Sequence, residues 1–327
     1  MIYIWQEKAW QQIGNHWAQM PHAWLFTGRE NTGKTAFACH FAQALLCENP
    51  RDNHDACGVC PSCHLFEQGT HPDFYALTPE EPETDVSARK LLQIKIDAVR
   101  AVLAPLWQTS VRGGRRVVLV QPAESMNIQA ANALLKILEE PPQAVVFLLV
   151  THHKDRVLST IKSRCRQFAL PAPTQAQSLS YLTEQGTENA AALLAFHSGA
   201  PLFEGQPEHD VLRDKLLALL AEPRLLAILD YAAEFDKQKW ALAVFLDWLD
   251  KWLIDVSLVA QNMSPLYYPH HAGAAKKMAE KTNPATLFSL SGSLNRLKPY
   301  GHHSLNVKMQ IEYLLSEYLS VVGKKSR

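Results

Sequence analysis

Residues Arg115–Pro142 read RRVVLVQPAESMNIQAANALLKILEEPP. Within them, the apolar and mostly β-branched run Val117–Val120 is typical of a strand buried in a parallel sheet. A helix is predicted from about Ile128 to Glu140, because apolar residues recur there at helical spacing and two prolines then end it. The residues expected on its buried face are Ile128, Ala131, Leu134, Leu135 and Leu138.

A second strand and helix enclose a glycine-rich loop. A buried strand is predicted at Ala23–Thr27 and a helix from Ala36 to about Cys47, and between them residues 28–35 read GRENTGKT. This is a full match to the phosphate-binding pattern GxxxxGK followed by Ser or Thr. Such a loop turns its backbone N–H groups toward a phosphate, and the following helix adds its positive end. The candidate nucleotide-binding residues are therefore Gly28, Gly33, Lys34 and Thr35.

The acidic residues of a phosphate-loop ATPase are missing at the end of the strand Val117–Val120. In such enzymes an Asp there holds Mg²⁺, and a Glu that activates water usually follows. Here the two positions are Gln121 and Pro122, which can neither ligate magnesium as an anion nor act as a base. We therefore expect no hydrolysis and doubt that Mg²⁺ is bound. Whether the loop holds ATP or ADP, or has kept its shape without a ligand, stays open.

Four cysteines are spaced like the ligands of a structural metal site. Cys57, Cys60 and Cys63 are each separated by two residues, and Cys47 precedes them. Four thiolates favour a closed tetrahedral Zn²⁺ site with no open position for chemistry. The alternatives are a disulfide pair, an iron–sulfur site and a cluster without metal. A scaffolding role is expected rather than DNA reading, because the loop carries only Arg51 as a basic side chain.

Composition excludes several classes of protein. The chain has 327 residues, with 32 Lys+Arg against 32 Asp+Glu, so it lacks the bulk positive charge of many nucleic-acid-binding proteins. No apolar run approaches the roughly 18 residues of a membrane span, and the N-terminus does not resemble a signal peptide. We therefore expect a cytoplasmic protein whose cysteines are reduced or metal-bound rather than disulfide-bonded.

Strands and helices alternate along the first half of the chain, which predicts a parallel sheet covered on both faces. A helix is expected over Lys90–Trp107, and a further strand over Val145–Val150, ending in Thr151. From about Gly205 the pattern is helical, which predicts an all-α region. Its tryptophans, among them Trp248 and Trp252, would either fill the core or form a subunit interface.

Several of these motifs together resemble one family. The run Asn132–Lys136 followed by Leu138–Pro142, the triplet Ser163-Arg164-Cys165 and the cysteine cluster resemble the AAA+ clamp-loader subunits of bacterial DNA polymerase III, most closely the delta-prime type. The resemblance is strong over residues 20–170. It implies an AAA+ phosphate-loop parallel-sheet domain at 1–170 with a zinc module at 47–63, a small helical lid domain at 171–206, and a helical collar domain for oligomerisation at 207–327.

The resemblance also implies roles for single residues. Arg164 would project as an arginine finger toward the ATP of a neighbouring subunit, where a planar and permanently charged guanidinium can stabilise a transferring phosphoryl group. The alternative is a surface arginine favoured by the helix dipole. Thr151 would sense the γ-phosphate, or would simply cap the turn after its strand. Leu202 stands where the lid domain normally carries a phosphate-binding arginine.

The function implied is that of a non-hydrolysing delta-prime subunit in the clamp loader. Its partners would be the gamma/tau and delta subunits in a hetero-oligomeric ring, and through that complex the sliding clamp and primer–template DNA, with no membrane. Two alternatives remain: an active clamp-loader ATPase of the gamma/tau type, and a stand-alone zinc module that binds DNA. The missing acids argue against the first, and the zero net charge argues against the second.

Overall fold

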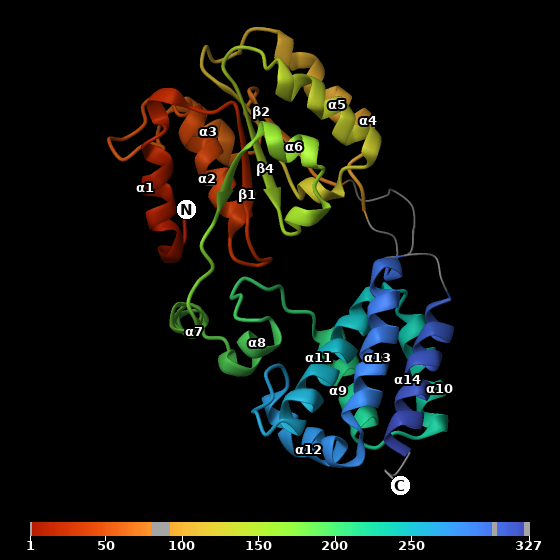
Figure 1. Ribbon diagram of the computed structural model, residues 1–327. Helices are drawn as coiled ribbons and strands as arrows, with labels where there is room; N and C mark the ends of the chain where they lie inside the picture. The colour runs from red at the N-terminus through yellow and green to blue at the C-terminus, as the bar shows by residue number, and fades with distance from the viewer. Residues whose placement is uncertain (1, 80–91, 303–305, 324–327) are drawn as a thin grey trace. The chain divides into compact units, whose positions relative to one another are not determined.

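The computed structural model describes residues 2–79, 92–302 and 306–323 (Figure 1). The described chain forms two compact units. The first contains the described residues up to 79 together with Leu92–Ser178 and Ala200–Leu202, and the second contains Leu179–Gly199 and the described residues from Phe203 onward. We describe each unit by itself. The three domains expected from the sequence, at 1–170, 171–206 and 207–327, stay a prediction.

The first unit is built on a parallel sheet. Its described strands lie in the order β2-β3-β4-β1-β5, and every neighbouring pair is parallel. The bounds are β1 Ala23–Thr27, β2 Phe74–Leu77, β3 Arg116–Val120, β4 Val145–Thr151 and β5 Arg166–Ala169. The three central strands match the predicted ones. The edge strands β2 and β5 were not predicted, since edge strands are partly exposed and lack a continuous apolar run.

Helices cover both faces of this sheet, which confirms the predicted α/β architecture (Figure 1). Successive strand residues point to opposite faces: Trp24 and Phe26 pack with one set of helices, whereas Leu25 packs with the other. The first set is α1 Glu7–Gly14, α2 Lys34–Leu46 and α3 Pro61–Glu67. The second set is α4 Ile96–Leu103, α5 Ile128–Glu139 and α6 Ser159–Arg164.

Two details of the predicted helices were wrong. Of the helix expected over Lys90–Trp107, residues 90 and 91 lie outside the described residues, and the α-helix begins only at Ile96 because Ile94 forms a β-bridge with Met126. In α5, Ile128 is 68% exposed. At 100° per residue it lies about 120° around the helix from the buried Leu134. The buried face is Ala130, Ala131, Leu134, Ile137 and Leu138.

The described residues of the second unit are all-α, as predicted, and share the hydrophobic core of that unit. Its helices after α7 Gln175–Glu184, which begins in the first unit, are α8 Ala190–Phe196, α9 Pro207–Ala221, α10 Leu225–Lys237, α11 Leu242–Ala260, α12 Ala272–Lys281, α13 Pro284–Leu297 and α14 Val307–Gly323. Trp248 and Trp252 are buried in that core. The Trp252 indole donates to the Tyr318 hydroxyl at 3.0 Å, and that hydroxyl donates to the Leu220 carbonyl at 2.9 Å. Across the described ranges, no helix combines the length and the apolar composition that crossing a bilayer requires.

Candidate functional site: the phosphate loop, a surface arginine and a four-cysteine cluster

The phosphate loop joins the end of β1 to the start of α2, as the motif predicted. Gly33 precedes the helix with φ of +88°, a conformation that only glycine adopts without strain. A Cβ added there would come within 2.5 Å of the Tyr3 ring. Residues 3–6 therefore lie directly against the loop. The indole of Trp5 and the side-chain amide of Gln6 both donate to the Thr32 carbonyl, at 3.1 and 3.2 Å.

Lys34 supplies a buried cation at the N-terminus of α2. Its side chain is enclosed, and its ammonium donates to the Arg29 carbonyl within the same loop. Burial lowers the Lys34 pKa to about 8, against the opposing charges of Glu30 and Glu124. The group is therefore still mostly protonated at neutral pH. A buried ammonium beside the N–H groups of a helix start is suited to binding an anion such as a phosphate.

Gln121 and Pro122 directly follow β3, so no acid occupies either position. The first carboxylate after the strand is Glu124, in the 3₁₀ turn Ala123–Ser125. Its Oε1 accepts the backbone N–H groups of His152 and His153, at 2.9 and 3.1 Å. Sequence reasoning missed Glu124. Glu124 could have been found from the sequence, because it is the first acidic residue after the strand Val117–Val120.

Thr151 is the last residue of β4 and is fully buried. It lies opposite Thr27, the last residue of β1, so it ends beside the strand that carries the phosphate loop. Its hydroxyl accepts the His153 N–H at 3.2 Å, and the same N–H is also donated to Glu124 Oε1 at 3.1 Å. These are the contacts of a strand-end hydroxyl, and they also place Thr151 in one hydrogen-bonded group with Glu124.

Leu202, where the resemblance leads one to expect a lid arginine, makes a backbone hydrogen bond to the phosphate loop. Its N–H donates to the Asn31 carbonyl at 3.2 Å, a contact that any residue other than proline could make. A leucine side chain has no donor for a phosphate. The loop is thus held from two sides, by Trp5 and Gln6 and by Leu202.

Arg164 is the last residue of α6 and lies at the surface of the first unit. Its guanidinium forms an ion pair with Glu139, with Nη2 and Oε1 at 2.5 Å, and also donates to the Thr160 carbonyl at 3.0 Å. The side chain is 35% exposed, and such partly exposed pairs stabilise a fold by only about 0–1 kcal/mol. The neighbouring Cys165 is buried instead, and burial raises the pKa of its thiol to about 12, so it is a packing residue.

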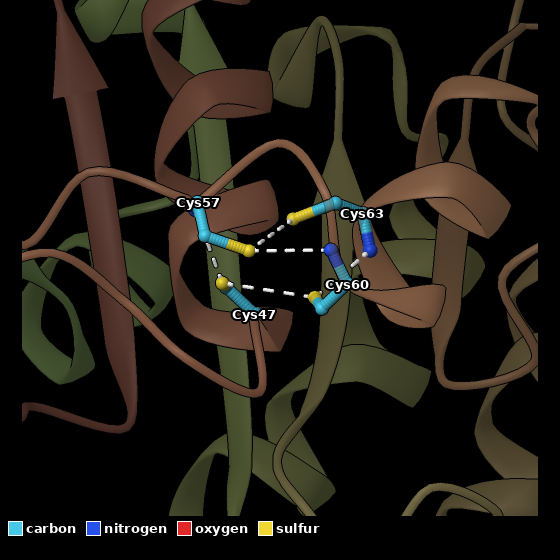
Figure 2. A group of neighbouring side chains, drawn as sticks. All are labelled: Cys47, Cys57, Cys60 and Cys63. Carbon is cyan, nitrogen blue, oxygen red and sulfur yellow. Dashed lines mark hydrogen bonds between the residues drawn. The ribbon is translucent and has the colours of Figure 1, made fainter.

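The four predicted cysteines come together after α2 (Figure 2). All four sulfur atoms lie within 4.8 Å of one another, and the pairs Cys47–Cys60 and Cys57–Cys63 are each 3.9 Å apart. The structure joins none of these four cysteines in a disulfide, and the sulfur pairs at 3.9 Å lie well beyond the S–S bond length of about 2.05 Å. Tetrahedral zinc with Zn–S bonds of about 2.3 Å would hold its sulfurs about 3.8 Å apart, so the cluster fits Zn²⁺.

The loop around the cysteines is tied to the rest of the first unit. Glu48, next to Cys47, accepts hydrogen bonds from the Ser62 hydroxyl at 2.9 Å and from the Arg112 guanidinium. Asp73 in turn accepts the backbone N–H groups of Val111 and Arg112, both at 2.9 Å. The cluster is thereby coupled to the loop that enters β3, which fits the expected scaffolding role.

A parallel sheet with a phosphate loop, a cysteine module and no acid directly after β3 defines an ATPase-type fold that lacks the usual hydrolytic residues. Residues 5–174 match the family model described as "DNA polymerase III, delta subunit". The chain is similar to DNA polymerase III subunit delta′ of Pseudomonas aeruginosa, at 35% identity over 98% of each chain. The delta′ subunit of Escherichia coli is 34% identical over 70% of each chain. The chain therefore belongs to the delta-prime family of DNA polymerase III subunits.

A second kind of relative matches only part of the chain. The tau subunit of Escherichia coli DNA polymerase III is 37% identical over 46% of this chain and 22% of its own length. The delta′ subunit of Pseudomonas aeruginosa, by contrast, matches 98% of the chain, and that of Escherichia coli matches 70%. The relationship to delta-prime subunits therefore includes the helical region as well as the sheet.

Proposed function

We propose that this chain is a non-hydrolysing subunit of the bacterial sliding-clamp loader and donates Arg164 to the ATP of a neighbouring ATPase subunit. The observation that carries the proposal is the partly exposed guanidinium of Arg164 at the end of α6, held by the weak surface pair with Glu139. Family membership and the absence of acids at Gln121 and Pro122 support it.

The chemistry required of Arg164 is electrostatic. Charge spreads over the oxygens of a transferring phosphoryl group, and an arginine supplied in trans stabilises that charge. Glu139 would keep the guanidinium at the surface in the free chain, and a phosphate of the partner would take the place of Glu139 in the ring. Exchanging one anion for another loses little energy, because the existing pair is partly exposed.

The remaining groups have supporting roles in this proposal. Zn²⁺ on Cys47, Cys57, Cys60 and Cys63 would fix the loop after α2. The phosphate loop would hold ATP or ADP without cleaving it. The partners would be the gamma/tau and delta subunits, and the complex would act on the sliding clamp and primer–template DNA in the cytoplasm. The lid domain at 171–206 and the collar domain at 207–327 belong to the same proposal.

ATP hydrolysis by the isolated protein and by its mixture with the ATPase subunit tests this proposal. We expect no turnover alone and DNA-stimulated turnover in the mixture. Arg164→Ala should lower turnover at the pocket that it serves by about 10³-fold or more, the range known for such fingers. The matched control is Arg156→Ala, a change to another exposed arginine of the same unit, which should leave turnover unaltered.

Three results would contradict the proposal. Normal turnover with Arg164→Ala would remove the finger, and steady magnesium-dependent turnover by the isolated protein would favour the active-ATPase alternative. Salt-sensitive binding of duplex DNA by the isolated protein would instead favour the zinc DNA-binding module.

A further inference from the structure

Glu124 is fixed in position by groups distant in sequence. It lies in the turn after β3, between the buried residues Ala123 and Ser125. Its Oε1 accepts the two N–H groups that follow β4, from His152 and His153. Because β3 and β4 are neighbours, this carboxylate bridges their carboxyl ends.

The second oxygen of this carboxylate is unused. Glu124 Oε2 is buried and has no hydrogen-bond partner among the described residues. Burial by itself would raise the pKa of the carboxyl, but hydrogen bonds from Thr151 and from backbone N–H groups outweigh it and hold the pKa below its ordinary value. The group is therefore a carboxylate at neutral pH. A buried anionic oxygen without a partner is costly, and an ion is one of the usual reasons for it.

This carboxylate lies at the edge of the sheet formed by the carboxyl ends of the strands, where the phosphate loop also begins. Its charge acts on Lys34, whose pKa it raises against the effect of burial. β4, whose end it contacts, pairs with β1 up to Thr27, the residue immediately before the loop. A second unpartnered oxygen, Gln121 Oε1, is buried three residues before Glu124. Oxygen atoms, carboxylates above all, are the ligands that Mg²⁺ takes, together with several waters and the phosphates of a nucleotide.

We propose that Glu124 is the acidic residue of a magnesium–nucleotide site, which replaces the acids missing at Gln121 and Pro122 and binds Mg²⁺ directly or through a water. The proposal rests on nucleotide binding by the phosphate loop. The site would take a magnesium-complexed nucleoside di- or triphosphate, with Lys34 and the loop N–H groups on the phosphates. Among the described residues that directly follow β3, neither Gln121 nor Pro122 can act as a base toward water, so the site would bind without hydrolysing.

A purely structural role for Glu124 makes a different prediction. If the carboxylate only fastened the turn after β4 and balanced the charge of Lys34, its loss would not change the response of nucleotide affinity to magnesium. Glu124→Gln separates the two roles, because the amide oxygen of glutamine can still accept the His152 and His153 N–H groups. Glu30→Gln is the matched control, because Glu30 is the other acid acting on Lys34 but is exposed.

The affinity of the full-length protein for fluorescent N-methylanthraniloyl-ADP, measured in magnesium and in EDTA, tests the proposal. We expect magnesium to strengthen binding by about tenfold or more in the unmodified protein and in Glu30→Gln. In Glu124→Gln the affinity in EDTA should be retained, and the gain from magnesium should be lost. Electron paramagnetic resonance of Mn²⁺ added with ADP should show one bound ion in the unmodified protein and weaker binding in Glu124→Gln.

An equal magnesium gain in Glu124→Gln and in the unmodified protein would overturn the assignment, as would an equal loss in Glu30→Gln. Absence of any magnesium effect, or of any ADP binding, in the unmodified protein would overturn it without a variant. None of these results decides the role of Arg164, whose readout is turnover by the neighbouring subunit.

Discussion

A fully buried carboxylate in the helical unit and a partly buried one in the sheet unit both hold loops by accepting backbone N–H groups, but only the first uses both of its oxygens. Asp255, on α11 of the helical unit, is fully buried, and both of its oxygens are used. Oδ1 accepts the N–H groups of Leu266 and Tyr267 at 2.6 and 3.0 Å, and Oδ2 accepts those of Tyr267 and Tyr268 at 3.1 and 2.7 Å. Glu124 accepts two N–H groups on one oxygen and none on the other.

The difference separates groups that complete the fold from groups that await a ligand. A carboxylate whose hydrogen-bonding capacity is filled by its own chain contributes stability and leaves nothing for chemistry. Unused capacity in a buried anion indicates an atom from outside the chain. The cysteine cluster belongs with Glu124 in this respect, because four thiols at ligand distance satisfy one another poorly without a metal.

The largest effect on stability is expected for Asp255→Ala, because this carboxylate has both oxygens hydrogen-bonded within its own chain. The substitution would leave three loop N–H groups without their acceptor, and each unsatisfied buried donor costs about 1–3 kcal/mol. We expect the free energy of unfolding to fall by about 3 kcal/mol or more, measured by denaturant unfolding of the full chain. Asp230→Ala, at an exposed acid of the same unit, should change it by less than about 0.5 kcal/mol. Equal stability of the Asp255→Ala and Asp230→Ala variants would show that Asp255 does not stabilise the fold and would contradict its contrast with Glu124.

Zinc binding should raise the free energy of unfolding of the first unit by somewhat less than the loss expected for Asp255→Ala. Zn²⁺ at a hundredfold excess over its dissociation constant adds about 2.7 kcal/mol to the folded state. Differential scanning calorimetry should therefore show a lower melting temperature after treatment with a chelator and its recovery when Zn²⁺ is added back. Cys60→Ser should abolish this response, whereas Cys39→Ser, outside the cluster, should keep it. The zinc site would be refuted if the purified protein contained no metal and its melting temperature changed neither with chelator nor with added Zn²⁺.

Apart from the control variants, the smallest effect on stability is expected for Glu124→Gln. The glutamine oxygen preserves the two backbone hydrogen bonds and removes a buried charge, so the free energy of unfolding without ligand should change by less than about 1 kcal/mol. Chemical denaturation in EDTA measures this directly. A loss as large as that of Asp255→Ala would assign Glu124 to the completed fold and remove the distinction between the two carboxylates.

Much of the fold could be predicted because its signals are local. The strands β1, β3 and β4 are continuous apolar runs, since both of their faces are buried. The edge strands β2 and β5 gave no such signal, because each is partly exposed. The start of α4 was missed for a related reason: Ile94 pairs with Met126, and no local pattern reveals a bridge to a residue so distant in sequence.

The candidate site divides in the same way. The phosphate loop and the four cysteines could be found because each depends on residues at fixed short spacings, where the chain itself sets the geometry. Arg164 was found only through a resemblance, and its pairing with Glu139 was not foreseen. Glu124 was missed because its partners, His152 and His153, follow a different strand.

The sequence by itself determined a phosphate loop between a strand and a helix, a four-cysteine group and the loss of two acids, because all are properties of short segments. Only the tertiary structure decided which carboxylates have both oxygens hydrogen-bonded within the chain. Asp255 and Glu124 both stand among ordinary helix and turn residues, and the N–H groups that they accept reach them by folding. A hydrogen-bonding group shows whether it has capacity to spare only once the chain has brought every available partner to it.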